Sequence, residues 1–163
     1  PFVIECLRAA VHVPDAFFVI CGSGTEYGKL QTFVEAEKYS NFLLLSGLPR
    51  ADYDKLVRSC HVGLLFLDHR FTIPNFPSRL LSYLQAGLPV IACTDPATDI
   101  GDIAQAGGFG WKCPSDDPAA FVRTVERACS ADLAAMGDAG RMYFSAHYTA
   151  EQSYEIIMRG LER

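Results

Sequence analysis

The sequence predicts an α/β fold, a doubly wound parallel sheet flanked by helices (Rossmann-like) with extra helices at the C-terminus. Two observations lead to this fold class. Apolar runs of strand length alternate with segments of helical periodicity, and the runs are apolar at every position instead of every second one. Strands buried on both faces of a parallel sheet have this pattern. Their alternation with helices is typical of a doubly wound layer.

Each element has a local signal. The predicted strands are Ala16–Cys21, Phe42–Leu45, Val62–Leu67, Val90–Cys93 and Phe109–Lys112. The predicted helices are Phe2–Ala10, Glu26–Lys38, Ala51–Cys60 and one that begins near Phe76 or Pro77 and ends at Gly87. After residue 113 the pattern is purely helical, with helix-start signals at Asp117-Pro118 and in the capping box Thr149–Gln152. We therefore expect two or three terminal helices to cover the edge and face of the sheet.

Composition excludes several classes of protein. The chain has 163 residues and a formal net charge of −5; 50% of its residues are hydrophobic and 20% are charged, which excludes a disordered chain. The length favours one domain over residues 1–163. The acidic balance argues against a nucleic-acid partner, which binds basic surfaces. No apolar run approaches the roughly 20 residues of a membrane-spanning helix.

The six cysteines are scattered and contain no Cys-x-x-Cys pair, and no histidine lies near a cysteine pair at ligand spacing. They are interpreted as small apolar residues of a core in a reducing compartment, so we expect a cytoplasmic protein without a metal or other cofactor. The helical pattern at Phe2 begins without a cap, and the sequence does not start with Met. We expect a domain excised from a longer, two-domain protein.

Ligands of open parallel sheets bind at the carboxyl ends of the strands. The first loop there contains Gly22, Ser23 and Gly24, and its glycines allow a ligand to approach the backbone closely. The spacing to Gly28 is one residue off the dinucleotide fingerprint, and no acidic residue ends the next strand to hold a ribose. These two observations disfavour an NAD site. A tight turn that binds no ligand is the alternative interpretation of these glycines.

The segment from Asn75 onward predicts an anion site. A helix that begins near Phe76 or Pro77 directs backbone N–H groups and its positive dipole end into the cleft, which favours a phosphate or diphosphate. Ser78 adds a hydroxyl donor and Arg79 a charged, forked donor. An ordinary helix with a polar first turn is the alternative.

Asp68 stands where a response-regulator receiver domain has its phosphoacceptor, directly after a predicted strand. Such a domain also needs acidic residues after its first strand and a lysine after its last. The sequence has glycine and threonine at these places. A loop aspartate beside a mobile cleft is therefore favoured over a receiver-like module.

Four segments together resemble the C-terminal, nucleotide-sugar-binding half of GT-B glycosyltransferases, specifically the family-4 retaining enzymes. They are Phe18–Gly24, Leu45–Arg50, His61–Phe66 and Pro74–Pro89. The last is similar to the stretch found in enzymes that build bacterial capsule or O-antigen polysaccharide. The resemblance covers about residues 2–128 and preserves the order and spacing of the four segments.

The resemblance implies a donor site made of three loops. The turn Gly22–Gly24 lines the cleft, the turn made of Gly47, Leu48, Pro49 and Arg50 packs on the base, and the backbone of Asn75, Phe76, Pro77 and Ser78 binds the diphosphate, with Arg79 beside it. The family's Glu-x7-Glu element falls on Pro74 and Ser82, so both glutamates are absent. Ser82 is expected to hydrogen-bond the ribose as a shorter, uncharged group.

The resemblance also implies the activity. The intact enzyme would transfer a sugar from a nucleotide-sugar donor, expected to be UDP-linked, to a growing cell-surface polysaccharide or a lipid-linked acceptor, with retention and without a metal. An Arg/Lys pair expected upstream of Pro1 supplies the catalytic cations, and the N-terminal domain supplies the acceptor site. The isolated chain is then expected to bind a nucleotide weakly and transfer no sugar. A UDP-sugar epimerase-like domain and a non-catalytic α/β regulatory scaffold are the alternatives.

Overall fold

The computed structural model describes residues 2–70, 73 and 75–161. All five predicted strands form, and they run parallel in two hydrogen-bonded sheets. One sheet pairs β1 (Phe18–Cys21) with β2 (Phe42–Leu45). The other has the order β3-β4-β5 and contains β3 (Gly63–Phe66), β4 (Val90–Thr94) and β5 (Gly110–Pro114). The prediction of parallel strands flanked by helices is confirmed.

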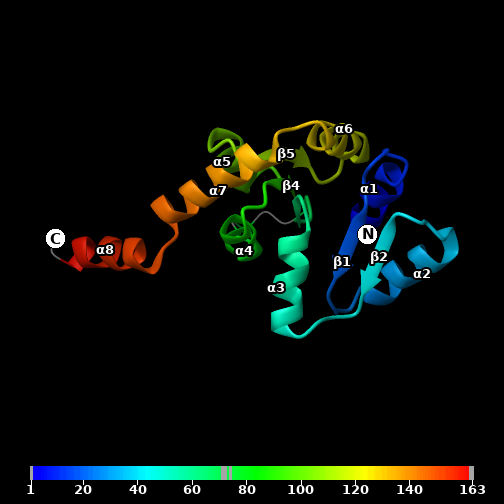
Figure 1. The fold of residues 1–163 in the computed structure, drawn as a ribbon, viewed down its shortest axis with the longest axis horizontal. Helices are drawn as coiled ribbons and strands as arrows, with labels where there is room; N and C mark the ends of the chain where they lie inside the picture. The colour runs from blue at the N-terminus through cyan, green and yellow to red at the C-terminus, as the bar shows by residue number, and fades with distance from the viewer. Residues whose placement is uncertain (1, 71–72, 74, 162–163) are drawn as a thin grey trace.

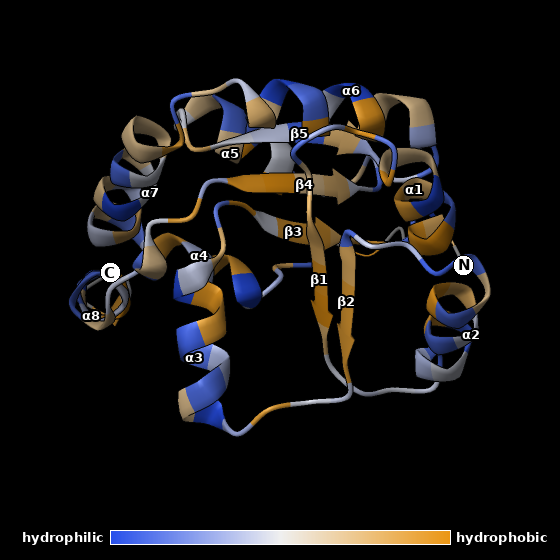
Figure 2. Ribbon diagram, turned by 45° about the vertical axis from the view of Figure 1, so that its right-hand side comes forward, coloured by the Kyte–Doolittle hydropathy of each residue, from blue (hydrophilic) through white to orange (hydrophobic). Residues whose placement is uncertain are grey.

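The predicted single sheet is divided in two. Figures 1 and 2 show β1 between β2 and the three-stranded sheet, with the strands of the two sheets running at a wide angle to each other. Strands so inclined cannot form a ladder, and no pairing joins the two sheets in the described residues. They share a side-chain core instead, because the ring of Phe121 lies 6.4 Å from that of Phe18 and 5.4 Å from that of Phe66.

Helices alternate with the strands as predicted, but the helix between β4 and β5, α5, was not predicted. α1 (Phe2–Ala10) precedes β1, and the others are α2 (Tyr27–Glu37), α3 (Arg50–Ser59), α4 (Arg79–Ala86), α5 (Ile100–Ala106), α6 (Pro118–Cys129), α7 (Leu133–His147) and α8 (Ala150–Leu161). The predicted cap signals are confirmed. Gly87 ends α4 at φ +74°, Asp117 caps α6 by accepting from the Ala120 amide at 2.9 Å, and Thr149 accepts from the Gln152 amide at 3.2 Å.

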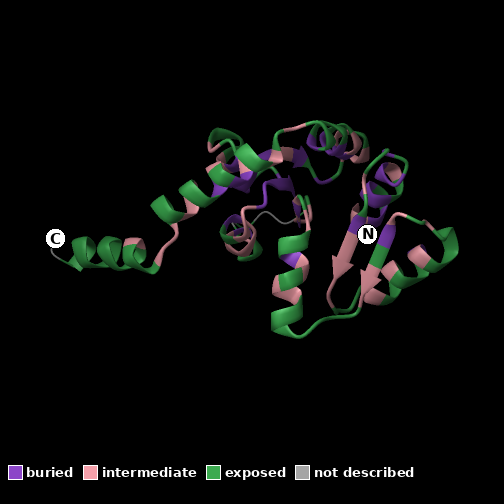
Figure 3. Cartoon of the chain, viewed as in Figure 1, coloured by how far each residue is buried: buried purple, intermediate pink, exposed green. Residues whose placement is uncertain are grey.

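The core follows from the apolar runs. Every residue of β4 is buried, as a strand covered on both faces must be (Figure 3). α1 and α6 cover one face around Leu7 and Phe121, and α4 and α5 enclose Leu84 and Phe109 on the other. All six cysteines are free thiols. Three of them (Cys6, Cys93 and Cys113) are buried as expected, whereas Cys129 is exposed.

The three terminal helices do not all cover the body. α6 packs on α1 and β5, and α7 packs along α4. α8 has no buried residue and extends away from the sheets (Figure 1). The expectation of covering helices is therefore wrong for α8, because α7 carries the chain past α4 before α8 begins. Among the described helices, none is both long and apolar enough to cross a bilayer.

Candidate functional site

The structure brings two of the predicted loops together. The turns after β1 and β2 are neighbours because the strands are paired in register, and the Gly22 amide donates to the Leu45 carbonyl at 3.0 Å. The third loop, before α4, follows β3 in the other sheet. The angle between the sheets thus separates the candidate site into a glycine part and an α4 part (Figure 2).

The glycine part is open to a ligand. A Cβ added at Gly22, Gly24 or Gly47 would meet no atom within 4 Å, so a ligand can approach this backbone. Gly47 has φ +144°, a conformation that side chains disfavour. Ser23, Leu48, Pro49 and Arg50 are exposed beside these glycines. The Arg50 guanidinium binds Asp54 along α3, at 3.0 Å.

The α4 part begins later than predicted. The first helical residue is Arg79 and not Phe76 or Pro77, and Ser78 is the N-cap. Phe76 precedes a proline, which disfavours helical backbone angles there. The carbonyl of Pro77 accepts from the Leu80 amide at 2.9 Å, so the first turn is tight.

Two side chains at this N-terminus are uncommitted. The Ser78 hydroxyl makes no capping hydrogen bond. Arg79 is exposed and forms no ion pair with a carboxylate of the described residues. Asn75 and Phe76 are exposed, Pro77 is half-buried, and Ser82 is half-buried one turn into α4. Pro74, the other position of the Glu-x7-Glu element, lies outside the described residues.

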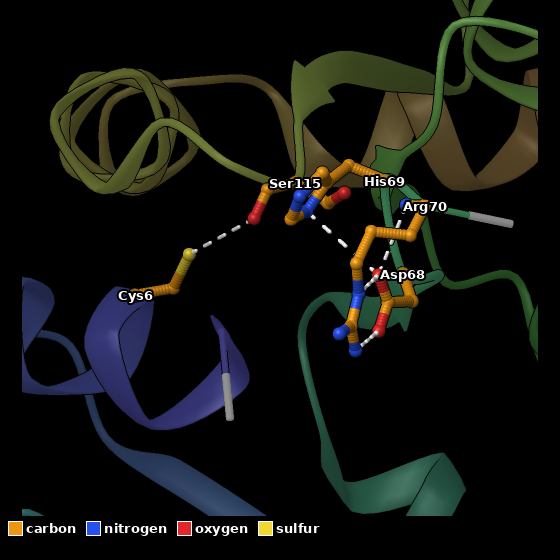
Figure 4. Close-up of polar contacts among 5 residues, drawn as sticks. All are labelled: Cys6, Asp68, His69, Arg70 and Ser115. Atoms are coloured by element: carbon orange, nitrogen blue, oxygen red, sulfur yellow. Dashed lines mark hydrogen bonds and ion pairs between the residues drawn. The ribbon is translucent and has the colours of Figure 1, made fainter.

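Asp68, at the carboxyl end of β3, is bound by the next arginine along the loop. Its Oδ1 accepts from the Arg70 amide at 3.0 Å and from Nε at 2.9 Å, and its Oδ2 accepts from Nη2 at 2.6 Å (Figure 4). His69 Nδ1 lies 3.8 Å from Oδ1. The hydrogen bonds from Arg70 hold the pKa of Asp68 well below its usual range. The charges of Asp68 and Arg70 neutralise each other, so we interpret Asp68 as a half-buried structural aspartate.

A buried carboxylate that the sequence interpretation missed orders the loop after β4. Asp95 is 1% exposed; its Oδ1 accepts from the amides of Ala97 at 2.8 Å and Thr98 at 3.0 Å, and its Oδ2 accepts from the Thr98 hydroxyl at 2.7 Å. The order Asp-x-x-Thr directly after a strand is the signal that would have found it. At the ends of β4 and β5, the buried hydroxyls of Thr94 and Ser115 have no hydrogen-bond partner among the described residues.

Asp95 predicts a pH dependence of stability. Burial raises the pKa of this carboxyl, but hydrogen bonds from Thr98 and from backbone amides outweigh burial and lower it overall. The stabilisation is therefore complete above the unfolded value of about 4 and is lost as the pH falls through the lower native pKa. We expect Asp95→Asn to cost about 1–3 kcal/mol at pH 7 and the deficit to shrink below about pH 4. Urea unfolding of both proteins from pH 3 to 7 measures this; a constant deficit would contradict it.

Within the residues described, no group of three or more His, Cys, Asp or Glu side chains is arranged to hold a metal ion. An open cavity of about 590 Å³ is lined by Val11–Phe17 and Tyr39–Asn41. It lies at the amino ends of β1 and β2, opposite the candidate loops, so it is not assigned to the site.

Comparison with known proteins identifies the family. The sequence pattern of the family described as "Glycosyl transferases group 1" matches residues 3–141. The chain belongs to this family. The match runs from α1 through all five strands into α7, so it includes both parts of the candidate site. It gives the epimerase-like and receiver-like alternatives no support.

The relatives of this glycosyltransferase family member are longer proteins. It is 25% identical over 155 residues to the probable glycosyltransferase WbjE of Pseudomonas aeruginosa, which covers 93% of the chain and 39% of WbjE. The crystal structure of WaaG, a glycosyltransferase involved in lipopolysaccharide biosynthesis, has a TM-score of 0.65 at 18% identity over 90% of the chain and 40% of WaaG. The glycotransferase of kitacinnamycin has a TM-score of 0.65 at 17% identity, over 98% of the chain and 39% of that protein. The fold is that of GT-B glycosyltransferases, and the chain spans about two-fifths of these relatives.

Proposed function

We propose that the chain is the donor-binding domain of a retaining glycosyltransferase that uses a UDP-sugar. The observation that carries the proposal is the N-terminus of α4, where the Ser78 hydroxyl makes no capping hydrogen bond and the Arg79 guanidinium forms no ion pair within the described residues. Such a terminus favours an anion. The family membership supports a diphosphate as that anion. The open backbone at Gly22, Gly24 and Gly47 supports a nucleoside in the glycine part of the site.

The chemistry asked of this site is electrostatic. When the sugar–phosphate bond breaks, negative charge accumulates on the departing diphosphate, and donors already aimed at it lower the barrier without reorganisation. We assign that task to Ser78 and Arg79, whose side chains and backbone amides precede the first hydrogen bond of α4. Ser82, one turn on, is proposed to bind the ribose hydroxyls.

The rest of the enzyme is proposed to complete the reaction. We assign the acceptor site, for a saccharide or a lipid-linked acceptor of a cell-surface polysaccharide, to an N-terminal domain, and a catalytic Arg/Lys pair to residues upstream of Pro1. The length of the relatives supports this division, because the chain covers only 39% of WbjE. On this proposal the enzyme transfers a hexosyl group without a metal, and the chain alone is inactive. The parent enzyme is proposed to work in the cytoplasm or at the inner face of the membrane.

Titration of the chain with UDP, GDP and NAD, followed by amide chemical shifts, tests the proposal. We expect UDP to shift the signals of Gly22–Gly24 and Asn75–Ser82, and NAD to shift neither set. Signals of Tyr39–Asn41, at the amino ends of the strands, serve as the internal control. A stronger response to GDP than to UDP would assign a GDP-sugar as the donor. No response to any nucleotide would favour the non-catalytic scaffold.

A further inference from the structure

α7 supports α4 along its whole length, and the two helices run antiparallel. At the C-terminal end of α4, Arg141 Nη2 donates to the Ala86 carbonyl at 3.1 Å. A Cβ on Gly137 would overlap the carbonyl oxygen of Gly87, so the two backbones are in direct contact there. In the middle, a Cβ on Gly140 would lie 3.0 Å from Leu84 Cδ2. The small residues of α7 thus bring its axis close to α4.

At the N-terminal end of α4, α7 also contacts the loop Asn75–Ser78, which we call the candidate phosphate loop. Tyr148, the C-cap of α7, packs its ring edge-on against Phe76, with 5.3 Å between the ring centroids. Phe76 is 44% exposed, and Asn75 and Ser78 on either side are exposed as well. Among the aromatic contacts of the described residues, Tyr148 is the only ring that touches Phe76.

Tyr148 is itself anchored. Its ring lies 5.8 Å from that of Tyr143, and the Tyr143 ring lies 5.0 Å from that of Phe109, which is fully buried. Its backbone amide donates to the Phe144 carbonyl at 2.8 Å. Burial, then the nearby Tyr143 and Asp99, raises the pKa of the Tyr148 phenol.

We propose that Tyr148 is a positioning residue for the phosphate loop, holding Phe76 and thereby Asn75–Ser78 at the N-terminus of α4. The proposal rests on the proposed function for the ligand, but the mechanical link stands on the contacts alone. Phe109 and Tyr143 connect the core to Tyr148, and Tyr148 connects to Phe76. A loop held by one ring contact loses its alignment when that ring is removed, and small displacements weaken binding strongly.

The test compares Tyr148→Ala, Tyr148→Phe and the matched control Tyr154→Ala in the 163-residue chain. Tyr154 lies on α8 and is 63% exposed. We expect Tyr148→Ala to weaken UDP binding about tenfold and Tyr148→Phe and Tyr154→Ala to leave it within about twofold, because the ring contact and not the hydroxyl is required. Hydrogen exchange of the Leu80 and Leu81 amides, which donate to the Pro77 carbonyl at 2.9 Å and the Ser78 carbonyl at 3.2 Å, should quicken in Tyr148→Ala, while exchange in Val90–Cys93 stays unchanged.

The outcomes separate this proposal from the proposed function. If the wild-type chain does not bind UDP, the proposed function fails, and quicker exchange of the Leu80 and Leu81 amides still supports the positioning role. If the wild type binds UDP and Tyr148→Ala binds equally well with unchanged exchange, the positioning role is overturned and the donor site stands. Should Tyr148→Ala fail to fold, Phe76→Ala removes the exposed half of the same contact. It must quicken the same two amides, and unchanged exchange overturns the proposal.

Discussion

Ser78→Asp is expected to abolish UDP binding while leaving the helix at least as stable as in the wild type. The substitution removes a hydroxyl donor and sets a negative charge against the diphosphate. Since a hydrogen bond to a charged group contributes about 1.5–3 kcal/mol, its loss and the added repulsion should raise the Kd at least 10–100-fold. Isothermal titration of both proteins with UDP measures the effect.

The same substitution acts on stability in the opposite direction. Ser78 is the N-cap of α4 and its hydroxyl caps nothing, whereas aspartate is a favoured N-cap and its charge complements the helix dipole. We expect a gain of about 0.5–1 kcal/mol in the free energy of unfolding. Loss of binding therefore cannot come from unfolding.

Ser40→Asp is the control for added charge. Ser40 is exposed just before β2, at the amino ends of the strands. It should leave UDP binding unchanged. If Ser78→Asp binds UDP as the wild type does, α4 is not part of the donor site.

Gly137→Ala is expected to be the most destabilising of the small substitutions. A methyl group there overlaps the Gly87 carbonyl oxygen, which is backbone and cannot turn aside. The gain in helix propensity, about 1 kcal/mol, is smaller than the cost of separating α7 from α4. We expect a net loss of about 3 kcal/mol, or a fall in Tm of roughly 6–12 °C for a domain of this size.

Gly28→Ala is the matched control. Gly28 lies in the first turn of α2, and a Cβ there would meet no atom within 4 Å. Thermal unfolding should show a Tm equal to or slightly above that of the wild type. A Tm for Gly137→Ala that rises in the same way would show that α7 is not held in backbone contact with α4.

The strands and most helix ends were predictable because their causes are local. A strand such as β4 is apolar at every position, and caps such as Asp117 and Gly87 act within a few residues. The start of α4 was misplaced because Phe76 and Pro77 carry conflicting signals, one against a helix and one for it. The family resemblance rested on the same kind of local segment.

The division into two sheets, the burial of Asp95 and the contact of Tyr148 with Phe76 could not be predicted. An aspartate in a loop and a tyrosine at a helix end are ordinary in sequence. Burial of Asp95 and contact of Tyr148 with Phe76 arise only when distant segments pack. Hydrophobic periodicity and turn signals act between residues close in sequence, so they can be recognised from the sequence alone. The angle between the sheets and the support of α4 by α7 depend on side chains far apart in sequence, such as Phe121 against Phe66, and exist only in the packed molecule.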